Sequence, residues 1–117
     1  MPTARPKRGV TIHTGIAVAT TESSVAHGVP QADDGMFQLD VTVVGAADNT
    51  LDIDIEGSND GLTWRVLGSF PTVAFGGEGT FGLPVEGIPR YVRSTATVGG
   101  AIPSLDFVVQ ADFYGRG

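Results

Sequence analysis

A row of carboxylates at alternate positions is the most acidic local feature of the sequence. It consists of Asp52, Asp54 and Glu56, with Asp60 just beyond. Calcium prefers several oxygen ligands of this kind, but an EF-hand loop starting at Asp52 would need its final glutamate where Thr63 stands. Aliphatic residues fill the intervening positions, which is typical of a strand with one solvent-exposed face. We therefore predict that these acids keep a sheet soluble and that the protein binds no metal or cofactor.

Residues suited to nucleophilic or acid–base catalysis are few and scattered. His13 and His27 are the only histidines, and Ser23, His27 and Asp33 could supply a serine, histidine and aspartate trio. Most chains of this length contain such a trio by chance, and no Gly-x-Ser-x-Gly elbow accompanies it. The glycine-rich run at 76–79 lacks the lysine of a phosphate-binding loop, and the absence of cysteine excludes thiolate chemistry. We predict that the protein is not an enzyme.

Charge is distributed unevenly along the 117 residues. Three of the seven basic residues, Arg5, Lys7 and Arg8, lie in the first eight positions, whereas from Gly9 onward thirteen acids face four bases, a charge of −9. So acidic a body repels phosphate backbones, and no apolar run is long enough to span a bilayer. We therefore expect neither nucleic acid nor membrane as a partner. Residues 1–9 form either a basic arm that binds a partner through Arg5, Lys7 and Arg8 or a solvated terminus.

The remaining residues, 10–117, are predicted to form a single all-β domain. Hydrophobic residues make up 41% of the chain, while seventeen glycines and seven prolines interrupt it, which is typical of short strands joined by turns. Apolar alternation predicts strands at 10–18, 36–44, 51–56, 64–67, 81–83, 90–98 and 105–113, and a long loop at 20–35. We expect an antiparallel β-sandwich of seven or eight strands with a jelly-roll-like topology.

The same alternation predicts which side chains face the core. Ile16 should share the inward face of its strand, and Val43 that of the next strand. Residues 45–50 and 99–103 are predicted to be hairpin connections. Trp64, the only tryptophan, is predicted to anchor the core, because a lone tryptophan in a small β-domain is more often interior than exposed.

Residues 55–64 (IEGSNDGLTW) resemble a hairpin found in several β-sandwich families. Discoidin domains carry a similar turn followed by tryptophan, although this chain is shorter than they are and lacks their terminal cysteine pair. The sialidase Asp-box is also similar, but it has one more residue between Asp60 and Gly61. In overall layout the chain resembles small structural proteins of tailed bacteriophages. Those proteins have a hairpin like 57–64, an Arg-Tyr-Val-Arg strand like 90–93 and a Gly-Gly-x-x-Pro-Ser turn like 99–104 before a terminal strand.

The phage resemblance implies a virion component, and we expect a capsid decoration (cement) protein. Such proteins commonly form trimers on the capsid surface and use a terminal arm to grip the shell. The implied partners are the major capsid protein or another virion protein and sister subunits, after assembly in the host cytoplasm. A tail or neck component built from the same sandwich is nearly as compatible with the resemblance. The residues also leave open a carbohydrate-binding module with Trp64 or Tyr91 over a sugar, although only three residues are tryptophan or tyrosine.

Overall fold

The computed structural model describes residues 7–29 and 34–114, without the side chains of Lys7 and Arg8. This part of the chain contains β-strands and no helix, which confirms the all-β prediction. Seven strands have five residues or more: β1 (Lys7–Val18), β4 (Asp34–Val44), β5 (Thr50–Ser58), β6 (Arg65–Ser69), β8 (Gly79–Glu86), β9 (Tyr91–Gly99) and β10 (Leu105–Tyr114). Three others have two residues each: β2 (Glu22–Ser23), β3 (His27–Gly28) and β7 (Val73–Ala74).

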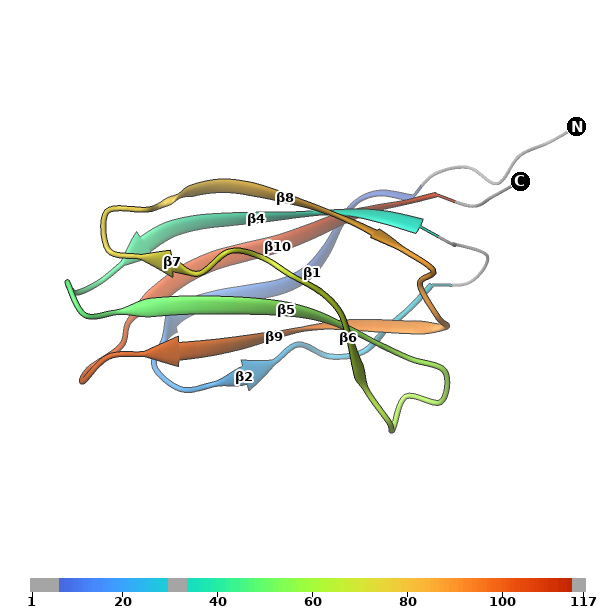
Figure 1. Cartoon of the computed structure of the whole chain (residues 1–117), viewed down its shortest axis with the longest axis horizontal. Helices are drawn as coiled ribbons and strands as arrows, with labels where there is room; N and C mark the ends of the chain where they lie inside the picture. The colour runs from blue at the N-terminus through green and yellow to red at the C-terminus, as the bar shows by residue number, and fades with distance from the viewer. Residues whose placement is uncertain (1–6, 30–33, 115–117) are drawn as a thin grey trace, which may run out of the picture.

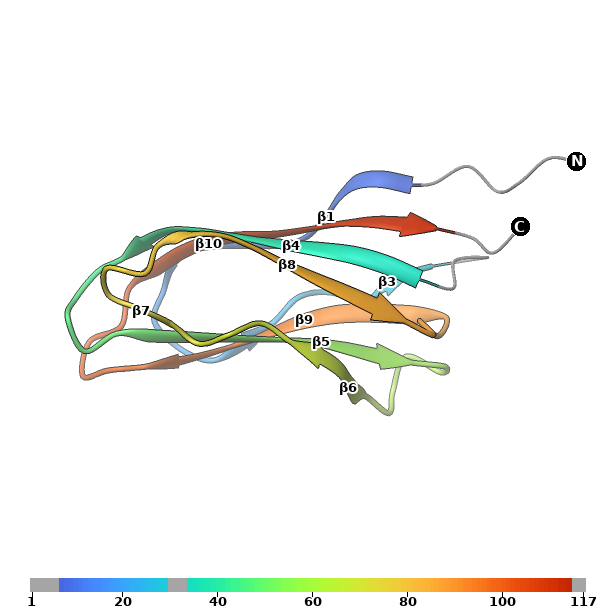
Figure 2. The ribbon, with the colours of Figure 1, turned by 45° about the horizontal axis from the view of Figure 1, so that its top comes forward.

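The strands form two sheets that pack face to face (Figures 1 and 2). The first sheet has the order β1-β10-β4-β8, and the second has the order β2-β9-β5-β6, with β3 also on β9 and β7 also on β5. The pairings between described strands are all antiparallel. The first strand pairs with the last, β2 and β3 with β9, β4 with β8, and β5 with β6. This nesting is a long hairpin folded over on itself, which confirms the predicted jelly roll.

The predicted long loop at 20–35 is wrong in part. It contains β2 and β3, and β4 already begins at Asp34. Both short strands pair with β9 and together fill the second position of the jelly roll. Strands of two residues are too short to show a period in the sequence, so apolar alternation could not reveal them.

The core lies between the two sheets and is built from alternate apolar positions. Ile53 and Ile55 of the second sheet and Phe37 and Phe107 of the first are almost completely buried. The rings of Phe37 and Phe113 meet edge to face with their centroids 5.7 Å apart. Burying so many large side chains supplies the main free energy of folding. Positions between them face outward and are mostly polar, so both outer sheet faces are solvent-exposed.

The strand β1 is bulged near both ends, and carboxylates of β10 hold the bulges. Gly9 and Ala17 have positive φ angles of 64° and 49°, and the register against β10 shifts at both places. Asp112 Oδ1 accepts a hydrogen bond from the backbone N–H of Gly9 at 2.7 Å, and Asp106 Oδ1 accepts one from Ala17 at 2.6 Å. Two outward-facing acids therefore satisfy backbone donors that the bulges remove from the ladder.

Two predicted core positions face solvent because of such register shifts. A shift between Thr11 and His13 leaves both Ile12 and His13 buried and reverses the alternation after them. Ile16 consequently points outward and is 77% exposed, so its predicted place in the core is wrong. The register shift between Asp106 and Phe107, against β4, has the same effect on Val43, which is exposed in place of the buried Val44.

The predicted hairpins at 45–50 and 99–103 are also wrong. The first segment leads from β4 in one sheet to β5 in the other, and the second leads from β9 back to β10. Both connections therefore cross between the layers, side by side at the left of Figure 1. Turn-forming residues predict a change of chain direction, but they do not show which sheet receives the next strand. We call this part of the molecule the crossover end.

Edge strands of the first sheet are poorly suited to adding a strand from another molecule. β8 pairs only with β4 among the described strands and contains Pro84, which has no N–H to donate. β1, at the other edge, is interrupted by its bulges. Natural sheets use both devices against edge-to-edge association. We therefore expect a partner to bind side chains of this protein rather than to extend a sheet.

Candidate partner-binding surface

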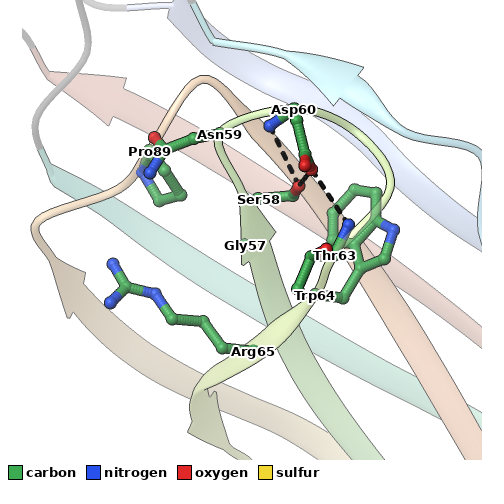
Figure 3. A pocket seen from close by; sticks show the side chains of 8 residues that line it. All are labelled: Gly57, Ser58, Asn59, Asp60, Thr63, Trp64, Arg65 and Pro89. Atoms are coloured by element: carbon green, nitrogen blue, oxygen red, sulfur yellow. Dashed lines mark hydrogen bonds between the residues drawn. The ribbon is translucent and has the colours of Figure 1, made fainter.

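The turn between β5 and β6 is held by its own side chains (Figure 3). Asp60 Oδ1 accepts hydrogen bonds from the backbone N–H groups of Thr63 and Leu62 at 2.9 and 2.8 Å, and from the Ser58 hydroxyl at 2.8 Å. These bonds, first that of Thr63, lower the pKa of Asp60 to about 2 because they favour the charged carboxylate. Gly61 has a φ of 76°, a left-handed conformation that glycine adopts without strain.

Trp64 follows the turn directly, and its predicted place in the core is wrong. The side chain is only half-buried and lies outside the cluster of buried apolar residues. Its ring packs instead against the Arg93 guanidinium, whose carbon lies 4.3 Å from the ring centroid. Arg93 Nε donates to Glu56 Oε1 at 2.8 Å. Because Glu56 and Arg93 face outward on neighbouring strands, the indole covers the outer face of the second sheet, where no other layer buries it.

A group of aromatic, aliphatic and basic side chains surrounds this hairpin. We call it the hairpin platform, and its members are Leu62, Trp64, Arg65, Val66, Arg90, Tyr91 and Arg93. Leu62 is 84% exposed and Val66 is 55% exposed. Arg90 lies over the ring of Tyr91, with 5.7 Å between the guanidinium carbon and the ring centroid. Every arginine whose side chain the structure describes belongs to this platform.

A shallow depression of about 330 Å³ adjoins the platform. Asn59 and Pro89 line one side of it, Thr63 and Trp64 line the other, and the Arg65 side chain extends away from the indole (Figure 3). The volume lies at the lower end of the range typical of ligand sites and is enough for one or two side chains of a partner.

The residues predicted from the sequence to bind a partner are not members of the hairpin platform. Arg5 is outside the described residues, and so are the side chains of Lys7 and Arg8. The backbone of both belongs to β1, which begins at Lys7, three residues before the predicted start of the first strand. The binding role of these three residues therefore stays a prediction.

The carboxylate row at 52–56 faces outward, as the alternation predicted, and each acid has a partner within the chain. Thr72 donates its hydroxyl to Asp52, and Ser69 donates to Asp54 at 2.6 Å. Glu56 accepts from Arg93 and also from Thr95, the latter at 2.7 Å. Across residues 7–29 and 34–114, no three histidine or acidic side chains are placed to hold a metal ion.

His13 links the two sheets instead of joining a loop site. Its Nδ1 lies 3.0 Å from the Ser94 hydroxyl and its Nε2 lies 2.7 Å from Glu22 Oε2, so β1 is tied to β9 and β2. Ser94 is fully buried, and a substrate could not reach its hydroxyl. Of the trio considered from the sequence, Ser23 bonds to Thr95 and His27 to the carbonyl of Ile12, whereas Asp33 lies outside the described residues.

Sequence reasoning missed the hairpin platform because its parts are far apart in the chain. The contact between Trp64 and Arg93 depends on β9 pairing with β5 in the register that sets Arg93 beside Glu56. One signal was available. Two of the four basic residues that follow Gly9, Arg90 and Arg93, stand only three positions apart in an otherwise acidic body, which marks this segment as a local concentration of positive charge.

No protein-family model matches the chain, and no curated protein matches it either. Among solved structures, the crystal structure of PBSX exported protein XepA is similar, with a TM-score of 0.62 and 18% sequence identity. The match covers 97% of this chain and 37% of the XepA chain. The likeness is one of fold. The described part of this chain contains no helix that could cross a membrane.

Proposed function

We propose that the protein is a non-enzymatic structural protein of a bacteriophage virion, and specifically a decoration protein that binds the capsid shell. The observation that carries the proposal is the shared fold, which extends along 97% of this chain to XepA, a phage-related protein. The order of its motifs, with the hairpin at 57–64 before the strand at 90–93, resembles that of phage structural proteins and supports the same function.

The hairpin platform gives such a protein a surface with which to bind. Tryptophan, tyrosine and arginine contribute most of the binding energy at protein interfaces. Trp64, Tyr91 and Arg93 lie together here, with exposed Leu62 and Val66 beside them. The turn satisfies its own backbone donors through Asp60, so a partner would meet a formed surface and pay little ordering entropy.

The proposed partners are the major capsid protein and sister subunits in a trimer. Acidic groups of the shell would contact Arg5, Lys7 and Arg8. These three basic residues are the part of an otherwise acidic chain that an acidic surface would attract. Since β1 begins at Lys7, this contribution can be tested by deleting residues 2–6 and replacing Lys7 and Arg8 by glutamine.

Quantitative mass spectrometry of purified phage particles tests the proposal. A decoration protein should be present in a copy number comparable to that of the major capsid protein, whereas a tail or neck component should be present in only a few copies. Absence from particles that contain all other virion proteins would contradict both. The arm variants should keep the melting temperature and lose occupancy, most strongly at low salt, because salt screens the exposed charges and so removes the arm's contribution from the unchanged protein as well.

Glycan binding is the second candidate function, and the position of Trp64 on an outer sheet face is the observation that favours it. An indole on a sheet surface can stack on a sugar ring, and Asn59 and Thr63 offer hydrogen-bonding groups beside it. However, one face of the indole is already covered by Arg93. A glycan array decides between the candidates: saccharide binding that Trp64→Ala abolishes would favour the glycan function.

A further inference from the structure

Arg93 is held in a fixed orientation by two different contacts. The Trp64 ring packs against its guanidinium at 4.3 Å, and Glu56 accepts the hydrogen bond of its Nε at 2.8 Å. Glu56 itself is fixed by the hydroxyl of Thr95 at 2.7 Å. An arginine held in this way loses little additional side-chain entropy when it binds a ligand.

The two terminal nitrogens of Arg93 remain available. A guanidinium carries five N–H donors, of which the Nε–H is used by Glu56. The structure contains no buried polar side-chain atom without a partner among the described residues, so the terminal nitrogens face water rather than an unsatisfied interior. Arg93 keeps 27% of its side chain exposed. Two parallel N–H donors at a fixed separation match the two oxygens of a carboxylate.

Neighbouring groups restrict the class of ligand. Glu56 and Asp60 place negative charge near Arg93 and Trp64, which disfavours a polyanion such as a phosphate-rich chain more than a single carboxylate. Val66 pairs with Glu56 on the side opposite Arg93 and is exposed. Leu62, in the turn, is exposed as well. Aliphatic side chains suit the apolar residues of a protein and offer no hydrogen bonds to sugar hydroxyls.

We propose that Arg93 and Trp64 form a receptor site for an aspartate or glutamate side chain of a partner protein, with apolar residues of that partner packing on Leu62 and Val66. This inference rests on the proposed function in that it names the chemistry of the partner. The occupant is a protein other than this chain.

The site can be tested with short peptides and isotope-labelled protein. The probes are a capped Leu-Glu-Leu peptide, the matched Leu-Gln-Leu peptide and polygalacturonate, each followed by NMR signals of Arg93 Nε–H and Trp64 Nε1–H. We expect the glutamate peptide to shift both signals and to bind about tenfold more tightly than the glutamine peptide, as the loss of one charge-assisted hydrogen bond would predict.

Substitutions separate a receptor from a merely structural pair. Arg93→Lys keeps the charge but loses the fork, and it should weaken the glutamate peptide about tenfold while the melting temperature changes little. Ile16→Ala is the control for a surface change away from the site, because Ile16 is exposed on β1 in the other sheet, and its affinity should equal that of the unchanged protein. If Arg93→Lys unfolds the domain, Trp64→Phe, which keeps a ring under the guanidinium, should still bind the peptide.

Four results would overturn the proposal: equal affinity for both peptides, tighter binding of polygalacturonate, unchanged affinity in Arg93→Lys, or self-association in sedimentation velocity that Arg93→Lys abolishes. Binding to phage particles distinguishes this inference from the proposed function. Particles that bind the unchanged protein and Arg93→Lys equally would leave the virion function standing and remove the receptor site. Particles that bind neither would contradict the virion function, while the peptide titration would still decide the site.

Discussion

The two ends of the second sheet use their polar groups differently. At the crossover end, the buried Asn49 accepts a hydrogen bond from the backbone N–H of Ser104 at 3.0 Å, and Asp48 accepts one from Ala101 at 3.0 Å. Gly45 donates to the carbonyl of Ser104 as well. Each of these bonds joins two separate loops. At the opposite end, the bonds of Ser58 and Asp60 stay within a single turn.

The difference indicates where binding is to be expected. Polar groups of the crossover end are consumed by fastening the two layers together, so a partner could bind them only by breaking the fold. The hairpin turn is complete in itself, and the side chains around it remain on the surface. The exposed side chain of Leu62 and the terminal nitrogens of Arg93 are examples, since neither holds the fold together through a hydrogen bond to another described residue. Such self-contained loops on a rigid scaffold are common places for binding residues.

The largest effect is expected at Asn49. Asn49→Leu leaves the Ser104 N–H and the surrounding carbonyls without a partner in a buried place, which should cost about 2–3 kcal/mol of unfolding free energy. Asn59→Leu at the hairpin end is the matched control. Asn59 is exposed, and its replacement should cost less than about 0.5 kcal/mol. Urea denaturation of both variants measures the difference, and similar losses would refute the comparison between the two ends.

A smaller effect is expected at Trp64. Trp64→Ala removes a half-buried ring and its contact with Arg93, which should cost about 1–2 kcal/mol. A true core anchor would cost about 3–5 kcal/mol on the same truncation. Phe107→Ala, which removes a ring that is 1% exposed, provides that reference in the same experiment. A loss at Trp64 equal to that at Phe107 would restore the core interpretation.

Much of the sandwich could be predicted from the sequence because apolar alternation directly reports a sheet with one buried face. The runs at 36–44, 51–56 and 105–113 correspond to β4, β5 and β10. Alternation fails wherever the register shifts, and Ile16 and Val43 are wrong for that reason. A bulge depends on where a donor such as the Ala17 N–H finds an acceptor, and the acceptor is nearly ninety residues away.

The candidate surface was less accessible to sequence reasoning than the fold. The turn itself was recognised from Asp60 and Gly61, whose local chemistry fixes it. The contact of Trp64 with Arg93 could not be predicted from neighbouring residues, because Arg93 comes close to the indole only through the pairing of β9 with β5. Composition favoured burial of a lone tryptophan, and the specific contact with a cation prevailed over that preference.

Strong acid should loosen the hairpin turn through the protonation of Asp60. The pKa of Asp60 is lowered from 3.8 to about 2 in the folded protein. The bonds that the carboxylate accepts therefore stabilise the turn fully at pH values above 3.8, and this stabilisation is lost as the pH falls through about 2. We expect the amide NMR signals of Leu62 and Thr63 to move over this interval. The Ser104 amide should not move with them. In Asp60→Asn the movement should disappear, and its persistence would assign the titration to another group.

We expect calcium to have no effect on the thermal stability of the protein. Asp52 and Asp54 already accept hydroxyl donors from Thr72 and Ser69, and Glu56 is paired with Arg93. A bound cation would have to displace these partners and then recruit oxygen ligands from a flat sheet face, where neighbouring side chains diverge. Melting curves in EDTA and in millimolar calcium should therefore coincide, and Asp54→Asn should not change their agreement. A calcium-dependent rise of several degrees that Asp54→Asn abolishes would show that the carboxylates, as well as the arginines of the hairpin platform, are free to bind.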